Sequence, residues 1–103
     1  MVDHKPRLTT QTLKVLATLM SRTQDEMSGA EIARSTKLSS GTLYPILFRL
    51  EKAGWVESRW ETEDPRELRR PRCRFYQVTG VGMKEARSAF REVVSSLMEF
   101  AWS

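Results

Sequence analysis

Residues 39–56 read SSGTLYPILFRLEKAGWV and predict one amphipathic helix. Its apolar residues recur at spacings of three and four, which places them on one helix face, and they are Leu43, Ile46, Leu47 and Leu50. Ser39 is suited to cap the helix start, and Gly54 to end it, because glycine adopts the left-handed conformation without penalty. Pro45 departs from the pattern, since a proline inside a helix removes a backbone hydrogen bond, and it predicts a kink or a loosened first turn.

Two further helices are predicted upstream. An amphipathic pattern covers about residues 10–22. Ser28 followed by Glu31 matches the capping box, in which each side chain accepts a hydrogen bond from the backbone N–H of the other residue. We therefore expect a second, short helix over about residues 29–36.

A β-hairpin with a long charged tip is predicted next. Residues 55–61 and 72–78 have the composition of strands, with imperfect alternation in the first segment. Residues 61–71 between them are mostly charged and contain two prolines, which is typical of a loop. Three helices followed by a hairpin form a winged helix-turn-helix, a mainly α fold with a β-hairpin (α+β). In this fold the third helix enters the DNA major groove and the hairpin tip reaches the neighbouring backbone or minor groove.

The last helix is predicted to begin after Thr79 and to carry a heptad pattern. The seam consists of Met83, Ala86, Phe90, Val93, Leu97 and Phe100, and a second apolar stripe beside it of Val94, Met98, Ala101 and Trp102. A helix that is apolar on two faces has more surface to bury than one small domain covers. We expect the seam to be a dimer interface, with packing on its own domain as the alternative.

Length and composition bound the organisation of the chain. Its 103 residues suffice for one domain with an appended helix. We expect a flexible N-terminus over residues 1–8, a winged helix-turn-helix DNA-binding domain over residues 9–78 and a C-terminal dimerisation helix over residues 79–103.

Charge favours an anionic partner. Seventeen Lys and Arg outweigh thirteen Asp and Glu, for a net charge of +4, and nucleic acid is the commonest such partner. The single Cys73 excludes an internal disulfide and a multi-cysteine zinc site. No stretch approaches the roughly 18 apolar residues of a membrane span. We expect a soluble, cytoplasmic protein that does not contact a membrane.

The third helix and the hairpin tip supply the candidate DNA contacts. Polar residues near the helix start could meet base edges, and they are Ser39, Ser40, Thr42 and Tyr44. Lys37 and Arg49 are candidates for phosphates. The tip contributes Arg66, Arg69, Arg70 and Arg72, against four nearby acids that could instead make it a plain solvated surface. Arg59 and Arg74 lie within the strands and are expected to contact DNA less.

Catalysis has little support in the residue pattern. The one histidine, His4, lies near the chain start, and Cys73 is better explained as a small packing group than as a nucleophile. No glycine-rich phosphate loop and no justified carboxylate pair occur. We expect no enzymatic activity, no cofactor and no metal.

Two stretches resemble the PadR-like family of transcriptional regulators. Residues 41–56, GTLYPILFRLEKAGWV, are similar to the signature of that family, and residues 74–82, RFYQVTGVG, to its second wing strand and the entry to its dimerisation helix. The resemblance implies a homodimeric repressor that binds an inverted repeat in double-stranded DNA. It also implies release of the DNA when a small molecule binds.

The single last helix resembles that of the short branch of this family. Some members of that branch bind flat aromatic or cationic compounds between the subunits, sandwiched by tryptophans. The resemblance implies that four aromatic residues are candidates for contact with a small aromatic effector: Trp60, Phe90, Phe100 and Trp102.

Two alternatives stay open. One is a winged-helix protein-interaction module, of the kind that a phage or mobile element uses against a host regulator, whose basic face is incidental. The other is a drug- or ligand-sensing regulator whose DNA binding is conditional. The operator, the effector, the regulated genes and the choice between activation and repression do not follow from the residues.

Overall fold

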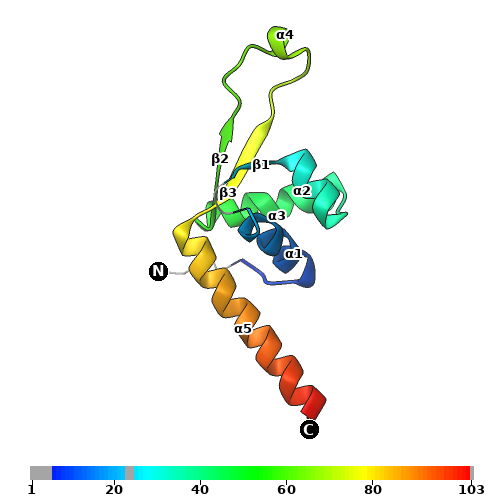
Figure 1. Ribbon diagram of the computed structural model, residues 1–103, viewed down its shortest axis with the longest axis vertical. Coiled ribbons are helices and arrows are strands. Elements are labelled where there is room, and N and C mark those ends of the chain that lie inside the picture. Colours follow the sequence, from blue (N-terminus) through cyan, green and yellow to red (C-terminus); the bar gives the residue numbers. More distant parts are fainter. Residues whose placement is uncertain (1–5, 23–24, 103) are drawn as a thin grey trace.

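The computed structural model describes residues 6–22 and 25–102. His4 and most of the segment expected to be a flexible N-terminus therefore lie outside the described residues. The described part consists of a helical core, a small sheet that extends into a wing, and a long last helix that leaves the core in the opposite direction (Figure 1).

The helical core is built from α1 (Thr10–Met20), α2 (Gly29–Thr36) and α3 (Ser40–Lys52). α1 ends two residues before the predicted limit. The capping box is confirmed: the N–H of Glu31 donates to the hydroxyl of Ser28, and the N–H of Ser28 donates to the Glu31 carboxylate. The hydrogen bond from the backbone N–H of Ser28 favours the charged carboxylate and holds the pKa of Glu31 below its ordinary value.

α3 confirms the helix predicted over residues 39–54. The four predicted apolar residues are all buried, and Gly54 follows the helix with φ +82°, as expected of a glycine stop. Pro45 lies inside the helix, which is continuous from its first turn. Ser39 occupies the cap position, but its hydroxyl donates to Oγ1 of Thr42 at 3.2 Å instead of accepting a backbone hydrogen bond.

The sheet is antiparallel and has the order β1-β3-β2. β2 (Val56–Trp60) and β3 (Arg74–Val78) form the predicted hairpin, each slightly shorter than expected, with Val56 opposite Val78 and Trp60 opposite Arg74. β1 (Met27–Ser28) was not predicted; it pairs with Tyr76 and Phe75 of β3. Two residues are too few to show strand periodicity, so this strand depends on tertiary pairing.

The hairpin tip contains a short helix, α4 (Pro65–Leu68), where the sequence predicts only a loop. Asp64 caps α4 by accepting a hydrogen bond from the N–H of Arg66 at 2.9 Å, and proline occupies the first helical position. We refer to β2, the tip and β3 together as the wing, which extends away from the helices (Figure 1).

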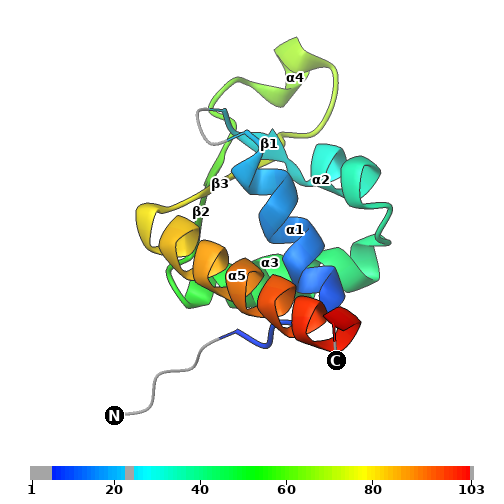
Figure 2. The same ribbon diagram turned by 60° about the horizontal axis from the view of Figure 1, so that its bottom comes forward.

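α5 (Gly80–Trp102) begins where β3 ends, and its first turn is fixed to the corner between α3 and β2. Thr79 caps it by accepting from the N–H of Gly82 at 3.0 Å, and the same hydroxyl donates to the carbonyl of Gly54 at 2.7 Å. A Cβ at Gly82 would overlap the backbone carbonyl of Trp55, so only glycine fits this crossing. The helix then passes beside α1 and continues beyond the core (Figure 2).

Candidate nucleic-acid interface

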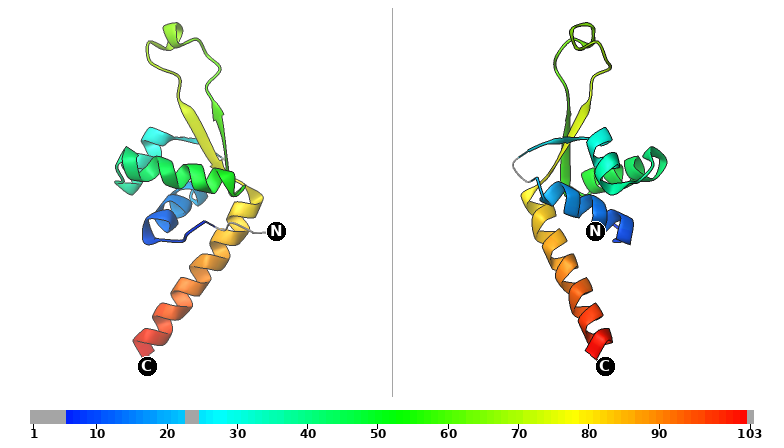
Figure 3. Two further views of the ribbon diagram at one scale, coloured as in Figure 1. Left: turned by 180° about the vertical axis from the view of Figure 1, so that it is seen from behind. Right: turned by 45° about the vertical axis from the view of Figure 1, so that its right-hand side comes forward.

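α3 lies at the base of the wing, with one face in the core and the other toward solvent (Figure 3). The outer face includes the predicted base-contacting residues: Ser39, Ser40 and Tyr44 are exposed and Thr42 is partly buried. Arg49, predicted to contact phosphate, is also exposed. Lys37 is exposed just before α3, where it ends α2 in the left-handed conformation with φ 61°.

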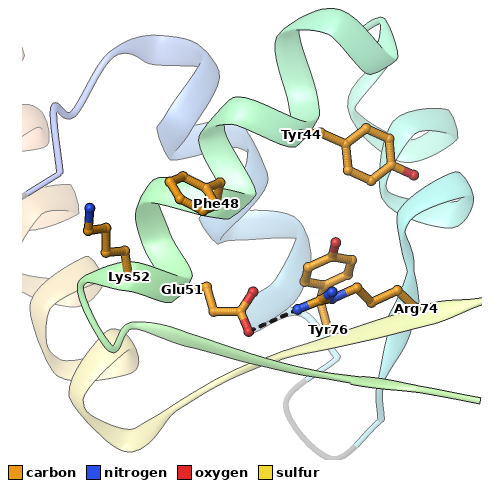
Figure 4. Close-up of a pocket in the computed structure, with 6 residues that line it drawn as sticks. All are labelled: Tyr44, Phe48, Glu51, Lys52, Arg74 and Tyr76. Carbon is orange, nitrogen blue, oxygen red and sulfur yellow. Dashed lines mark hydrogen bonds and ion pairs between the residues drawn. The ribbon is translucent and has the colours of Figure 1, made fainter.

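Tyr44 points from α3 toward the start of α2 (Figure 4). A Cβ built on Gly29 would overlap the hydroxyl and the ring edge of Tyr44, so the tyrosine packs directly on the backbone of α2. The side chain is nevertheless half exposed. Tyr44 therefore connects α3 to α2 and also presents part of its side chain to solvent.

An open pocket of about 680 Å³ separates the outer face of α3 from β3 (Figure 4). Its lining combines aromatic and charged side chains, namely Tyr44, Phe48, Glu51, Lys52, Arg74 and Tyr76. Phe48 is 65% exposed, and the ammonium of Lys52 lies 5.8 Å from the centre of its ring. Sequence reasoning missed Phe48 and Lys52. Phe48 follows Tyr44 by four residues and Lys52 follows Phe48 by four, which places all three on the same helix face.

Glu51 connects α3 to both wing strands. Oγ of Ser58 on β2 donates to Oε2 of Glu51 at 2.5 Å, and Nε of Arg74 on β3 donates to that hydroxyl at 2.9 Å. Nη2 of Arg74 lies 3.5 Å from the same carboxylate oxygen (Figure 4). The guanidinium of Arg74 also stacks over Trp60, 5.2 Å from the ring centre.

A second acid holds the opposite face of the wing. Arg59 donates to the carboxylate of Glu26 from Nε and Nη2 at 2.7–3.0 Å and lies over the ring of Phe75. The hydrogen bond to Glu26 raises the pKa of Arg59. Both strand arginines thus have a carboxylate partner within their own chain, and their weaker contact with DNA stays a prediction.

At the wing tip, Arg70, which was predicted to contact phosphate, is bonded to an acid of its own chain. Its guanidinium forms a paired interaction with the carboxylate of Glu61 at 2.7 and 2.9 Å, and Nη1 lies 2.9 Å from Sγ of Cys73. Glu61 is 9% exposed and also accepts from the N–H of Cys73 at 3.0 Å. These donors, Arg70 first, hold the pKa of Glu61 below its ordinary value. Arg70 closes the base of the tip, and sequence reasoning could not separate it from its neighbours.

The other tip arginines are exposed. Nε of Arg72 donates to the backbone carbonyl of Glu63 at 2.9 Å, which fixes part of its side chain. For Arg66 and Arg69, no side-chain hydrogen bond or ion pair is found within residues 6–22 and 25–102. Arg69 ends α4 in the left-handed conformation, with φ 57°. Arg66 and Arg69 are therefore the tip cations with the greatest freedom to meet an external anion.

The predicted heptad seam of α5 divides into two parts. Ala86 is fully buried in the core of its own chain, and Met83 and Phe90 pack partly against that core. Its own chain therefore covers Ala86 in this structure, because the first turns of α5 pack on the core, and its place in a dimer interface stays a prediction. Beyond Phe90 the seam is exposed: Val93 is 41%, Leu97 62% and Phe100 85% accessible.

The candidate effector residues are not brought together within one chain. Trp60 lies on the wing, whereas Phe100 and Trp102 lie on the far half of α5, at the opposite end of the molecule (Figure 1). Trp60, Phe100 and Trp102 are exposed, while Phe90 is partly buried against the core. A site that contains all of them would need a second chain.

Other kinds of site are not seen in the described residues. No cluster of three or more His, Cys, Asp or Glu side chains is placed to hold a metal ion there. No helix among them is long and apolar enough to cross a membrane.

Three helices followed by an antiparallel hairpin, with the exposed face of the third helix beside that hairpin, define a winged helix-turn-helix. The model of the "Transcriptional regulator PadR-like family" matches residues 17–88, so the chain belongs to that family. The resemblance found in residues 41–56 is thereby confirmed. Members of the family are transcriptional regulators, not enzymes.

Solved structures agree with this assignment. A PadR family transcription regulator from Clostridium difficile R20291 has a TM-score of 0.70 and 20% identity, over 92% of this chain and 100% of that one. A PadR family transcriptional regulator from Eggerthella lenta DSM 2243 has a TM-score of 0.70 and 21% identity, over 84% of this chain and 77% of that one.

A structure of Staphylococcus aureus MepR in complex with DNA is also similar, with a TM-score of 0.67 and 19% identity, over 92% of this chain and 71% of that one. At these identities the likeness concerns the fold. Among curated proteins, no sequence matches the chain.

Proposed function

We propose that this chain is a homodimeric transcriptional repressor that binds double-stranded DNA through the start of α3 and the wing tip. The observation that carries the proposal is which arginines have an acid partner. Arg59, Arg70 and Arg74 are each bonded to a carboxylate. Among the described residues, Arg49 on α3 and Arg66 and Arg69 at the tip are exposed and have no such partner. A duplex that contacts both α3 and the wing tip would bring its phosphates close to these cations.

Sequence selectivity would come from α3. Its exposed first turn carries the hydroxyls of Ser39, Ser40 and Thr42, and hydroxyl groups can bond to base edges in the major groove. Tyr44 would add the part of its side chain that is exposed to solvent. The tip arginines would supply affinity that depends little on sequence.

Dimerisation through the far half of α5 is the second element of the proposal. Val93, Leu97 and Phe100 form an exposed apolar row together with the neighbouring stripe of Val94, Met98 and Trp102. Patches of this kind mark interaction surfaces. A two-fold dimer would present two copies of α3 to an inverted repeat, about 34 Å apart if they enter successive major grooves. Bound at a promoter, it would repress by occupying the duplex.

The test uses a duplex enriched from a random-sequence pool by the full chain, and a scrambled duplex of the same composition. Fluorescence anisotropy is measured on both at about 50 mM and about 200 mM salt. The proposal expects preference for the enriched duplex, a steep loss of affinity with salt, and two chains per site. Weak binding that is alike on both duplexes would instead favour a protein partner for this surface.

The ligand-sensing alternative has a narrower basis. The exposed Trp60 and Trp102 are suited to stack on a planar aromatic compound, but only a second chain could bring them near each other. Quenching of tryptophan fluorescence by such a compound, with release of bound DNA, would support it.

A further inference from the structure

The wing is a two-stranded ribbon that leaves the core, and its base is held on both faces. On the face toward α3, the buried pair Val56 and Val78 is followed outward by Ser58 opposite Tyr76 and then by Trp60 opposite Arg74. The hydrophobic core thus ends where the contacts of Glu51 begin. A two-stranded ribbon is marginally stable in isolation, so its direction depends on such contacts.

Glu51 supplies a polar contact between α3 and the wing. One of its two carboxylate oxygens, Oε2, contacts groups from both strands: the hydroxyl of Ser58 at 2.5 Å and Nη2 of Arg74 at 3.5 Å. Ser58 closes the triangle by accepting from Nε of Arg74 at 2.9 Å. Because Glu51 lies one turn beyond Phe48 on the outer face of α3, its position is tied to that of the DNA-facing surface (Figure 4).

We propose that Glu51 is a positioning residue, which fixes the wing at one angle to α3 and thereby determines how strictly the protein discriminates between DNA sequences. The inference rests on the proposed function. Specific binding requires α3 and the wing tip to meet their parts of the duplex at once, whereas non-specific binding requires only cations near phosphates. If the angle between the wing and α3 varied, the protein would bind its specific duplex more weakly and would still bind non-specific DNA.

Replacing Glu51 with Ala should therefore weaken specific binding without weakening non-specific binding. Affinity for the enriched duplex falls because the wing must be ordered on binding. Affinity for scrambled DNA stays or rises, since a negative charge is lost and Arg74 is released toward phosphates. The ratio of the two affinities should drop about threefold or more, in line with coupling between contacting groups.

Glu57→Ala is the matched control. Glu57 is an exposed acid on β2, next to Ser58 but on the other face of the ribbon. Its removal changes the charge of the wing base by the same amount and leaves the Glu51 contacts in place. A general electrostatic effect would raise binding to both duplexes alike in both variants, whereas positioning lowers the ratio in Glu51→Ala only.

Hydrogen exchange without DNA gives an independent readout. In Glu51→Ala, exchange should speed up over residues 56–60 and 74–78 relative to Glu57→Ala, while α1 stays protected. Ser58→Ala, which removes only one hydroxyl from the triangle, serves if Glu51→Ala does not fold. Unchanged exchange in the wing strands would overturn the inference, as would an unchanged affinity ratio. If the wild-type chain prefers no duplex, the proposed function fails, and the exchange result alone then decides whether Glu51 holds the wing.

Discussion

The hydroxyl of Tyr44 occupies the space that a Cβ at Gly29 would need. This contact joins the outer face of α3 to the first turn of α2 at the only helix start that has a full capping box among the described residues. The residue expected to meet bases is therefore held by the element that precedes it in the helix-turn-helix. Substitutions at Gly29 should act on Tyr44 without touching DNA themselves.

Gly29→Ala should displace the ring of Tyr44, because the added Cβ meets the far end of a side chain that can rotate away. We expect a small change in stability, since alanine favours a helix by up to about 1 kcal/mol and offsets part of the lost contact. Discrimination between the enriched and the scrambled duplex should fall as far as in Tyr44→Ala. Gly80→Ala, where nothing lies within 4 Å of the added Cβ, is the control and should bind normally. Full discrimination in Gly29→Ala would show that the position of Tyr44 does not matter.

Gly82→Ala should be far more harmful than Gly80→Ala. At Gly82 the added Cβ meets the backbone carbonyl of Trp55, which cannot move without shifting the corner between α3 and β2. Overpacking of this kind should lower the melting temperature by about 10 °C or more. Thermal unfolding followed by circular dichroism tests it. Equal melting temperatures for the two variants would mean that α5 does not cross Trp55 this closely.

The wing tip should loosen in acid. The pKa of Glu61 is depressed by Arg70 and by the N–H of Cys73, so its contribution to stability is present above the ordinary glutamate pKa of about 4.3. That contribution is lost as the pH falls through the lower value of the folded chain. The amide resonance of Cys73, which donates to Glu61, should follow this titration in NMR spectra. Glu61→Gln should abolish the response, and a response that persists would assign it to another group.

The tip arginines should differ in their effect on salt dependence. Replacing Arg66 and Arg69 together by Ala should reduce the slope of log affinity against log salt by up to about 2, one for each lost phosphate contact. Arg70→Ala should instead leave that slope nearly unchanged and increase exchange at the tip, because Arg70 is bonded to Glu61. A reduced slope in Arg70→Ala with an unchanged slope in the double variant would show that Arg70 contacts phosphate and that Arg66 and Arg69 do not. Anisotropy titrations at several salt concentrations decide between them.

The exposed half of α5 predicts a separable dimer interface. Val93→Glu combined with Leu97→Glu should give a folded monomer in sedimentation, since both side chains are exposed in the single chain and their loss leaves the core intact. Ser88→Glu adds one of these two negative charges at another exposed position of α5, outside both apolar stripes, and should leave the dimer unchanged. A folded dimer in the double variant would place the interface elsewhere.

Periodicity in the sequence was enough to predict the core face of α3, the hairpin and the last helix, because each is a local pattern. The acid contacts of the wing were not predictable in this way. Glu51 and Arg74 are 23 residues apart and Glu26 and Arg59 are 33 apart, so their pairing exists only once the sheet has formed. For the same reason, composition alone could not distinguish Arg70, which is bonded to Glu61, from the neighbouring arginines that have no acid partner among the described residues.

The heptad seam shows another limit of pattern reasoning. Ala86 and Phe100 are two heptads apart and occupy equivalent positions in the repeat, yet Ala86 is buried in its own chain and Phe100 is exposed. An apolar repeat states which face of a helix is buried, and not what buries it. The boundary at Phe90 follows from how far the core reaches along α5.

The most direct test of the DNA-binding account is hydrogen exchange of the full chain with and without saturating enriched duplex. We predict new protection at the start of α3, over residues 39–44, and at the wing tip, over residues 64–70, with little change in the first turns of α5. Protection confined to α5, or none at all with the duplex bound, would contradict the proposed interface.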